Sequence, residues 1–357
     1  KFAKSKESEI YKAWAWGNYN YQSKSKKNLL YVKEQKELEF LTFYSDCINL
    51  SRDLINSPAN KLNPSIYYSK IKNNNLFKSF NFIDYTEKEI NSNFPLTCAV
   101  GKSSSSKPKV IEITNRKLSK KDKPLVIIGK GVTFDTGGVN IKPGTSMRNM
   151  KKDMGGSAIA ISLFLLANYF LKKTKIVLIA PIAENAISSK SMRPGDVYSS
   201  VSGKSVEIAH TDAEGRLLLA DAIEKASSYN PCMIIDFATL TGAARVALGE
   251  DLPAYFCNNE TFAKKIENLN KEKLRCWRLP LYSPYLFKIK SQVADLSNAS
   301  LDGMAGSITA ALFLQEFLKS PNIPWFHFDT FAWSQDSKGA ALQGLDIMSD
   351  FLRKNFN

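Results

Sequence analysis

Short apolar runs alternate with longer segments of helical periodicity along most of the chain. The runs are bounded by turn-forming or charged residues, which predicts strands that are buried on both faces. The predicted strands are residues 109–114, 124–128, 175–180, 233–237 and 325–330. The predicted helices are residues 34–56, 157–171, 217–228, 308–318 and 346–354. This alternation predicts an α/β fold, with a mixed, largely parallel sheet flanked by helices on both faces.

One apolar segment is long enough to raise the question of a membrane span. Residues 154–171 carry no charge over eighteen positions. As a helix they would reach about 27 Å, at roughly 1.5 Å per residue. A bilayer core is about 30 Å thick, and the segment also contains glycine, serine and asparagine. We therefore predict a helix buried against the sheet and no membrane association.

The amino-acid composition limits which binding partners and which cellular compartment are expected. The 357 residues include 44% hydrophobic residues, enough for a large core, and the formal net charge is +15. The lysines are spread along the whole chain without interleaved aromatic residues, so a solvated basic surface is favoured over nucleic-acid binding. The cysteines are odd in number and form no CxxC pair, which predicts free thiols in a reducing, cytoplasmic compartment. They are Cys47, Cys98, Cys232, Cys257 and Cys276.

The strongest chemical signal is the short segment 210–217, which contains Asp212, Glu214, Gly215 and Arg216. In an extended segment, side chains two positions apart share a face, so Asp212 and Glu214 can converge on one point. Gly215 allows close approach of the backbone, and the planar guanidinium of Arg216 can hold an anion. Alone, such a segment is typical of a solvated turn.

A second segment upstream strengthens that signal. Lys130 follows the predicted strand 124–128, at the end of the sheet where open α/β folds bind ligands. A glycine-rich loop then carries Asp135 and Lys142, and Asp153 follows just before the apolar segment. We expect this loop and the segment 210–217 to face one another.

Several carboxylates in one place would repel one another and raise one another's pKa. A pair of divalent cations removes this repulsion, and two-metal hydrolytic sites hold them about 3.5–4 Å apart. A lysine can join such a site only as the free amine. The alternative is that Lys130 and Lys142 are loop lysines that pair with Asp135 and Asp153.

Four motifs occur in a defined order: GKGVTFDTGGVNIKP at residues 129–143, RPGD at 193–196, TDAEGRL at 211–217 and ATLTGA at 238–243. In these motifs the chain resembles the leucyl (cytosol) aminopeptidase family, from about residue 41 to near its C-terminus. The resemblance implies a catalytic domain over residues 41–357. It also implies that residues 1–40 are the remnant of an N-terminal domain.

The resemblance also implies roles for the charged residues. Two divalent metal ions would be held by Lys130, Asp135, Asp153, Asp212 and Glu214. Asp135 and Glu214 would bridge the two ions, and a hydroxide between them would attack the peptide bond. Lys142 would act as the electrophile, and Arg216 would hold a bicarbonate that shuttles the proton. The ions would be Zn²⁺ or Mn²⁺, with Co²⁺ and Mg²⁺ as further options, because availability decides among them.

For the substrate, the resemblance implies an aminopeptidase that acts on short peptides. Met150, Thr239 and Gly242 would line the side-chain pocket, and the carbonyl of Leu240 would face the substrate amine. Phe331 stands where the family has a small residue. It either packs in the core or fills the pocket, and in the pocket it predicts a preference for small or unbranched residues such as Ala, Met or Cys.

One residue departs from the family pattern. His210 stands where the motif normally begins with Asn, which implies a hydrogen-bonding substitute or an extra metal ligand. Two alternative functions stay open, a narrow dipeptidase of the Cys-Gly type and a DNA-binding member with secondary peptidase activity. The resemblance further implies a cytoplasmic homohexamer.

Overall fold

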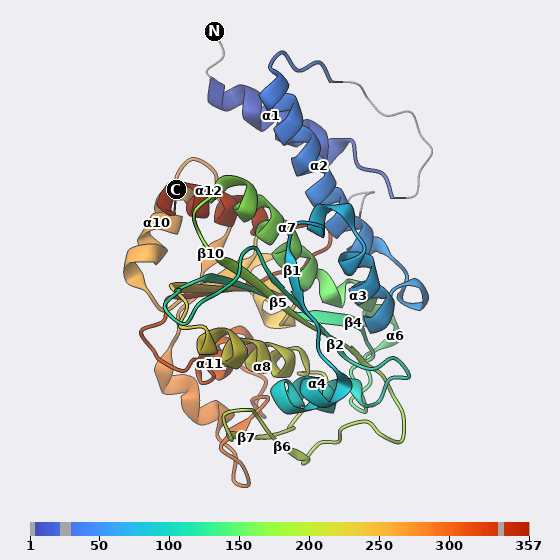
Figure 1. The fold of residues 1–357 in the computed structure, drawn as a ribbon. Helices are drawn as coiled ribbons and strands as arrows, with labels where there is room; N and C mark the ends of the chain where they lie inside the picture. Colours follow the sequence, from blue (N-terminus) through green and yellow to red (C-terminus); the bar gives the residue numbers. More distant parts are fainter. Residues whose placement is uncertain (1–3, 22–29, 335–338, 357) are drawn as a thin grey trace.

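The computed structural model describes residues 4–21, 30–334 and 339–356 (Figure 1). Among them, nine strands form one sheet, in the order β1-β2-β5-β3-β8-β12-β9-β10, with β4 paired to β5. Three further strands form a small sheet in the order β11-β7-β6. The strands are β1 (Asn81–Ile83), β2 (Lys109–Thr114), β3 (Leu125–Gly129), β4 (Gly131–Asp135), β5 (Ile176–Asn185), β6 (Val197–Ser199), β7 (Ser205–Glu207), β8 (Met233–Ala238), β9 (Ala254–Cys257), β10 (Trp277–Arg278), β11 (Leu296–Ser297) and β12 (Trp325–Asp329).

Helices precede, connect and follow these strands. The α-helices are α1 (Lys4–Gly17), α2 (Gln35–Asn56), α3 (Pro64–Lys72), α4 (Glu87–Asn93), α5 (Pro95–Gly101), α6 (Gly144–Met147), α7 (Gly155–Phe170), α8 (Gly215–Ser228), α9 (Gly242–Leu248), α10 (Glu260–Asn270), α11 (Gly306–Gln315) and α12 (Leu345–Asn355). Short 3₁₀ helices are η1 (Ala59–Lys61), η2 (Asn75–Phe77), η3 (Met150–Met154) and η4 (Ser283–Ile289).

The predicted fold class is confirmed. The four central strands β5, β3, β8 and β12 are parallel, while β2 and β9 run antiparallel to their neighbours β5 and β12. Every predicted strand and helix is present, with ends that differ by a few residues. The largest difference is at β5, which continues to Asn185, five residues beyond its predicted end. This extension matters because β4 pairs with it.

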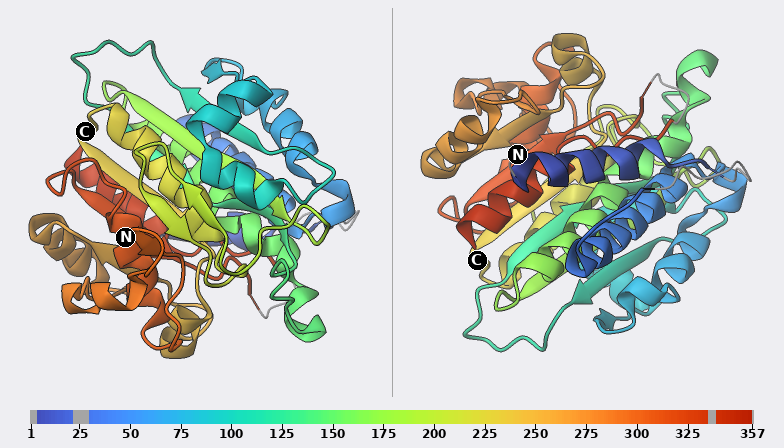
Figure 2. Two further views of the ribbon diagram at one scale, coloured as in Figure 1. Left: turned by 90° about the horizontal axis from the view of Figure 1, so that it is seen from below. Right: turned by 90° about the horizontal axis from the view of Figure 1, so that it is seen from above.

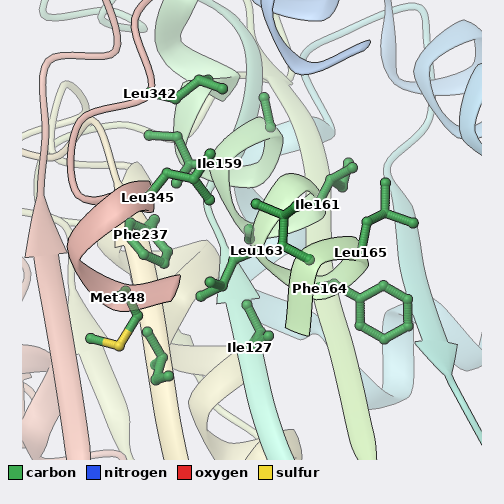
Figure 3. Close-up of a cluster of buried hydrophobic side chains, with 14 of the residues drawn as sticks. Ile127, Ile159, Ile161, Leu163, Phe164, Leu165, Phe237, Leu342, Leu345 and Met348 are labelled. Carbon is green, nitrogen blue, oxygen red and sulfur yellow. The ribbon is translucent and has the colours of Figure 1, made fainter. Parts of the chain in front are cut away.

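Alternate residues of the sheet pack into two separate cores. In β3, Leu125 and Ile127 belong to the core between the sheet and helices α2, α7 and α12. Val126 and Ile128 belong to the core on the other face, between the sheet and helices α5, α8 and α11. Figure 2 shows the two helical layers from opposite sides, and Figure 3 shows side chains of α7, β3, β8 and α12 meeting in the first core. Burial on both faces explains the continuous apolar runs in the sequence.

The uncharged segment forms η3 and helix α7. Residues Met150–Phe170 are long and apolar enough to span a membrane by composition, but 83% of the apolar window is buried in the protein. The first turn of α7 lies directly on the strand ends, because a Cβ at Gly156 would come within 2.2 Å of the Phe237 carbonyl oxygen. The prediction of a buried core helix is confirmed, and the helix begins beside the residues of the candidate site.

The N-terminal segment packs on helix α2. The indole of Trp16 donates a hydrogen bond to the Tyr44 hydroxyl (2.9 Å), and the Tyr19 hydroxyl donates one to Asp53 (2.8 Å). The guanidinium of Arg52 lies over the rings of both Trp16 and Tyr19. The division into a remnant at residues 1–40 and a catalytic domain at 41–357 stays a prediction.

Candidate active site

Lys130 sits at the junction of two strands, β3 and β4. The residues after it were expected to form a loop, and this expectation is wrong for Gly131–Asp135, which form strand β4 beside the extended end of β5. The ammonium group of Lys130 is buried. It lies 2.7 Å from a carboxylate oxygen of Asp153 and 3.2 Å from one of Glu214, and it donates a hydrogen bond to the Thr239 carbonyl (2.8 Å).

Three carboxylates from the two predicted segments converge. Asp135, Asp212 and Glu214 each offer one oxygen, and these oxygens all lie within 4.8 Å of one another. Lys142 bridges two of them, with its Nζ 3.0 Å from Asp135 and 2.5 Å from Asp212. The expectation that the two segments face one another is therefore met, and Asp153 joins them through Lys130.

The carboxylates of this cluster are buried close together, and this raises the pKa values of two of them. Burial, and then the charge of Asp135, raise the pKa of Asp212 to about 6. The same two causes raise the pKa of Glu214 well above its ordinary value. Burial acts to lower the pKa of Lys142, but Asp135 and Glu214 outweigh it and raise that pKa. The protein's own ammonium groups therefore compensate only part of the negative charge.

The residues present fit divalent cations. Neither carboxylate oxygen of Glu214 has a hydrogen-bond partner among the described residues, although both are buried. Buried acceptors without partners are costly, and hard cations prefer carboxylate oxygens. Lys130 and Lys142 do pair with Asp153 and Asp135, as the loop-lysine alternative predicts. That alternative also places Lys130 3.2 Å from Glu214, but it leaves both Glu214 oxygens without a hydrogen bond, whereas a cation site uses all of these groups.

Arg216 lies in the first turn of α8, two residues after Glu214. The residue is 7% exposed, and its Nε and Nη1 atoms have no hydrogen-bond partner among the described residues. Burial lowers the pKa of Arg216 to about 10, so it remains a cation at neutral pH. A buried guanidinium with two nitrogens free of hydrogen bonds fits a small planar anion, because its donors form a fixed fork.

Two glycines let the loops approach. A Cβ at Gly215 would lie 2.3 Å from Cε of Lys130, so the close approach predicted for this glycine is present. Gly137 has φ of +86°, and a Cβ there would lie 2.4 Å from the Asn140 carbonyl oxygen and 3.0 Å from Asp212. Both positions therefore require glycine if the carboxylates and Lys130 are to meet.

A cavity of about 570 Å³ opens above the cluster. Lys142, Asp153 and Asp212 form part of its wall. All five residues assigned to the substrate pocket line it as well, namely Met150, Thr239, Leu240, Gly242 and Phe331. Of the two places expected for Phe331, the structure therefore shows the pocket wall. Their roles in binding substrate stay predictions.

Sequence reasoning missed three residues that hold the site together. Asn185 donates hydrogen bonds to Asp135 (2.8 Å) and to the Thr211 carbonyl (3.1 Å), which ties the two segments to each other. The Thr211 hydroxyl donates to the Gly137 carbonyl (2.6 Å). Asp329 accepts hydrogen bonds from the backbone of Leu240 and Thr241 (both 3.1 Å), which fixes the loop before α9. Asn185 and Asp329 end β5 and β12, and that position was the available signal.

His210 is exposed at the rim of the cavity. Its Nδ1 accepts a hydrogen bond from the backbone N–H of Asp212 (3.2 Å), and Asn298 holds its backbone on both sides. Burial lowers the pKa of His210, and Lys142 and Arg216 add to this effect. The ring thus contacts the loop backbone rather than the converging carboxylates. This geometry fits the hydrogen-bonding substitute better than the extra ligand.

Comparison with known families agrees with this geometry. The model of the cytosol aminopeptidase family, catalytic domain, matches residues 49–348. A probable cytosol aminopeptidase of Syntrophotalea carbinolica is 38% identical over 298 residues, which are 83% of this chain and 59% of that protein. One of Chlamydia caviae is 41% identical over 288 residues, which are 79% of this chain and 57% of that protein. The chain thus spans under three fifths of the length of these curated relatives.

Two solved structures share the fold over 98% of this chain and 79% of their own. One is the cytosol aminopeptidase from Coxiella burnetii, with a TM-score of 0.88 and 38% identity. The other is the bottromycin maturation enzyme BotP in complex with Mn, with a TM-score of 0.87 and 29% identity.

Proposed function

The chain belongs to the cytosol aminopeptidase family, a family of metal-dependent aminopeptidases, and on this premise we propose that it removes the N-terminal residue from short peptides. One observation carries the proposal. Three carboxylates converge within 4.8 Å of one another beside Lys130 and Lys142, and Lys142, Asp212 and the neighbouring Asp153 border one cavity. Both oxygens of Glu214, and Nε and Nη1 of Arg216, have no hydrogen-bond partner among the described residues, which supports external cations and an anion.

Two divalent ions, when bound by Lys130, Asp135, Asp153, Asp212 and Glu214, would supply Lewis acidity and lower the pKa of water. Zn²⁺ and Mn²⁺ are the ions we propose, with Co²⁺ and Mg²⁺ as substitutes. A neighbour of this chain, BotP, was solved with Mn, which supports a divalent ion of this kind. Lys130 would join as the free amine, and nearby dications lower the pKa of a lysine far enough to allow it.

The remaining residues would orient the substrate and move the proton. Lys142, which points at Asp135 and Asp212 from the cavity wall, would donate to the carbonyl oxygen of the scissile bond. Arg216 would hold a bicarbonate that carries the proton to the leaving amine. The loop before α9, which Asp329 fixes, would present the Leu240 carbonyl to the substrate's α-amine. Because this contact needs a free α-amine, the protein would act only on peptides with an unblocked N-terminus.

The test compares metal content with activity on free and blocked peptides. The purified chain is stripped with a chelator and then reconstituted separately with Zn²⁺, Mn²⁺ and Co²⁺. We expect Leu-, Met- and Ala-peptides to be cleaved only by the reconstituted protein, with two ions bound per chain. N-acetylated versions of the same peptides are the control and should resist cleavage. Cleavage that survives chelation, or equal cleavage of the acetylated peptides, would overturn the proposal.

We also propose a cytoplasmic location and a homohexamer with no membrane or nucleic-acid partner. The relatives are named cytosol aminopeptidases, and all five cysteines are free thiols. Light scattering of the purified chain measures the assembly. A shift of labelled duplex DNA at low salt, lost at high salt, would instead favour the DNA-binding alternative.

A further inference from the structure

Two cations in the cavity wall have no role in the site described so far. Lys152 is 4% exposed, and it lines the cavity. Its Nζ lies 4.4 Å from the centroid of the Phe331 ring. Arg245, on α9, borders the same cavity, and its Cζ lies 4.6 Å from the same centroid. Phe331 therefore brings the two cations to one part of the wall.

Neither cation is neutralised by the part of the chain that the structure describes. No described carboxylate lies within 4.0 Å of Lys152 Nζ or of the Arg245 guanidinium. The adjacent carboxylate, Asp153, is already engaged by Lys130 through one oxygen and by the Thr239 hydroxyl through the other. The Asp329 carboxylate accepts from the loop before α9.

Lysine is almost never fully buried without a partner, because removing an ammonium group from water is costly. Here Lys130 and Lys142 add further positive charge nearby. The cost is offset if an anion enters the cavity during function. A carboxylate in this place would form charge-assisted contacts with buried Lys152 and with exposed Arg245.

We propose that this cavity selects peptides whose N-terminal residue is glutamate or aspartate, with the side-chain carboxylate held between Lys152 and Arg245. The inference deepens the proposed function and rests on it. Lys152 directly precedes Asp153, a proposed metal ligand, so an anion bound there is close to the scissile bond.

The carboxylate that binds these two cations could belong to the side chain of the N-terminal residue or to the C-terminus of a dipeptide, and the structure favours the side chain. Met150, Thr239 and Gly242, the residues assigned to the side-chain pocket, line the same cavity. The preference also agrees with a pocket that Phe331 narrows, since glutamate is unbranched. Glu250 borders the cavity too, but lies more than 4.0 Å from either cation.

The experiment measures kcat/KM of the Mn²⁺-reconstituted chain for p-nitroanilides of Glu, Gln, Asp, Asn, Leu, Lys and Arg. Glutamine has the shape of glutamate without its charge, so the Glu/Gln ratio isolates the electrostatic part. We expect a ratio of about 10 to 100, the scale of one or two hydrogen bonds to charged groups. Lys152→Met should lower the ratio toward one, and Lys152→Glu should move the preference to Lys and Arg substrates.

Lys173→Met is the matched control, because this exposed lysine follows the far end of α7 and should keep the wild-type ratio. Arg245→Gln, on an exposed surface of α9, should lower the ratio as well and decides the matter if the Lys152 variants do not fold. A wild-type ratio of one or less, or a ratio unchanged in the folded variants, overturns the inference. Absence of activity on every substrate would contradict the proposed function instead.

Discussion

Gly215→Ala tests whether Lys130 is held where the structure places it. Gly215 is the first residue of α8, and a Cβ there would lie 2.3 Å from Cε and 2.6 Å from Nζ of Lys130. Ordinary contacts begin near 3.4 Å, so Lys130 must move by about 1 Å. The lysine has little freedom to do so, because Asp153, Glu214 and the Thr239 carbonyl hold its ammonium group in a buried site.

Two opposing effects determine how much Gly215→Ala changes the stability of the protein. Alanine is the better helix former, by up to about 1 kcal/mol relative to glycine. Overpacking of a buried site costs about 1–3 kcal/mol, so the steric effect should win and the variant should be less stable. A misplacement of about 1 Å in a catalytic constellation can cost about 10²-fold in rate. We therefore expect a small loss of stability and a large loss of kcat/KM.

The assays are urea unfolding of the metal-free chain, metal content after reconstitution, and kcat/KM on a Leu-peptide. Gly144→Ala is the matched control, because Gly144 also begins a helix, α6, and a Cβ there meets nothing within 4 Å. It should keep wild-type stability and activity. If Gly215→Ala also bound two ions and turned over at the wild-type rate, the close packing of Gly215 against Lys130 would be refuted.

Four further predictions follow from the same geometry. Glu214→Gln should fold but lose turnover, because a proposed bridging carboxylate becomes a weaker, neutral ligand; wild-type activity with two ions bound would contradict the assignment. Arg216→Ala should keep both ions and slow turnover by about 10²–10⁴-fold, with partial rescue by added bicarbonate, and full activity at low bicarbonate would exclude the shuttle. Burial and Asp135 raise the pKa of Asp212 to about 6, so the folded metal-free chain holds a proton that the unfolded chain releases near its ordinary pKa of 3.8. This contribution to the free energy of unfolding is therefore lost as pH rises from about 4 through 6. Urea unfolding with chelator present measures this dependence, and Asp212→Asn should make the free energy of unfolding depend less on pH over this range. Phe331→Ala should raise kcat/KM for Leu relative to Ala by about one to two decades, and an unchanged ratio would mean that the ring does not limit the pocket.

The sequence predicts the central architecture well because its strands are buried on both faces. Runs such as those of β3 and β8 are almost entirely apolar, which is typical of parallel strands between two helical layers. The short strands were missed for the opposite reason. β6 is exposed or half-buried, and β10 is two residues long, so neither leaves a pattern that can be distinguished from a turn.

The charged residues of the candidate site were likewise predictable, since they stand in long motifs at the ends of strands. The residues that hold these charged groups in place were not predictable from the sequence. Asn185 acts from the end of a strand that continues beyond its apolar run, and the uncompensated charge of Lys152 depends on what surrounds it in space. In the sequence Lys152 is one lysine beside another, and only its burial distinguishes it.

The contacts of Lys130 also have a consequence for the order of folding. Its ammonium group joins the ends of two neighbouring strands, through a carbonyl 109 residues away, and meets Glu214 from a third segment. Such distant contacts close large loops, and their entropic cost is offset only once the intervening sheet has formed. We therefore expect the ion-binding geometry to arise late in folding, after β3, β5 and β8 have paired. Uptake of metal by a refolding chain would report pairing of these central strands, and a truncated nascent chain that ends before residue 239 would lack the carbonyl that holds Lys130.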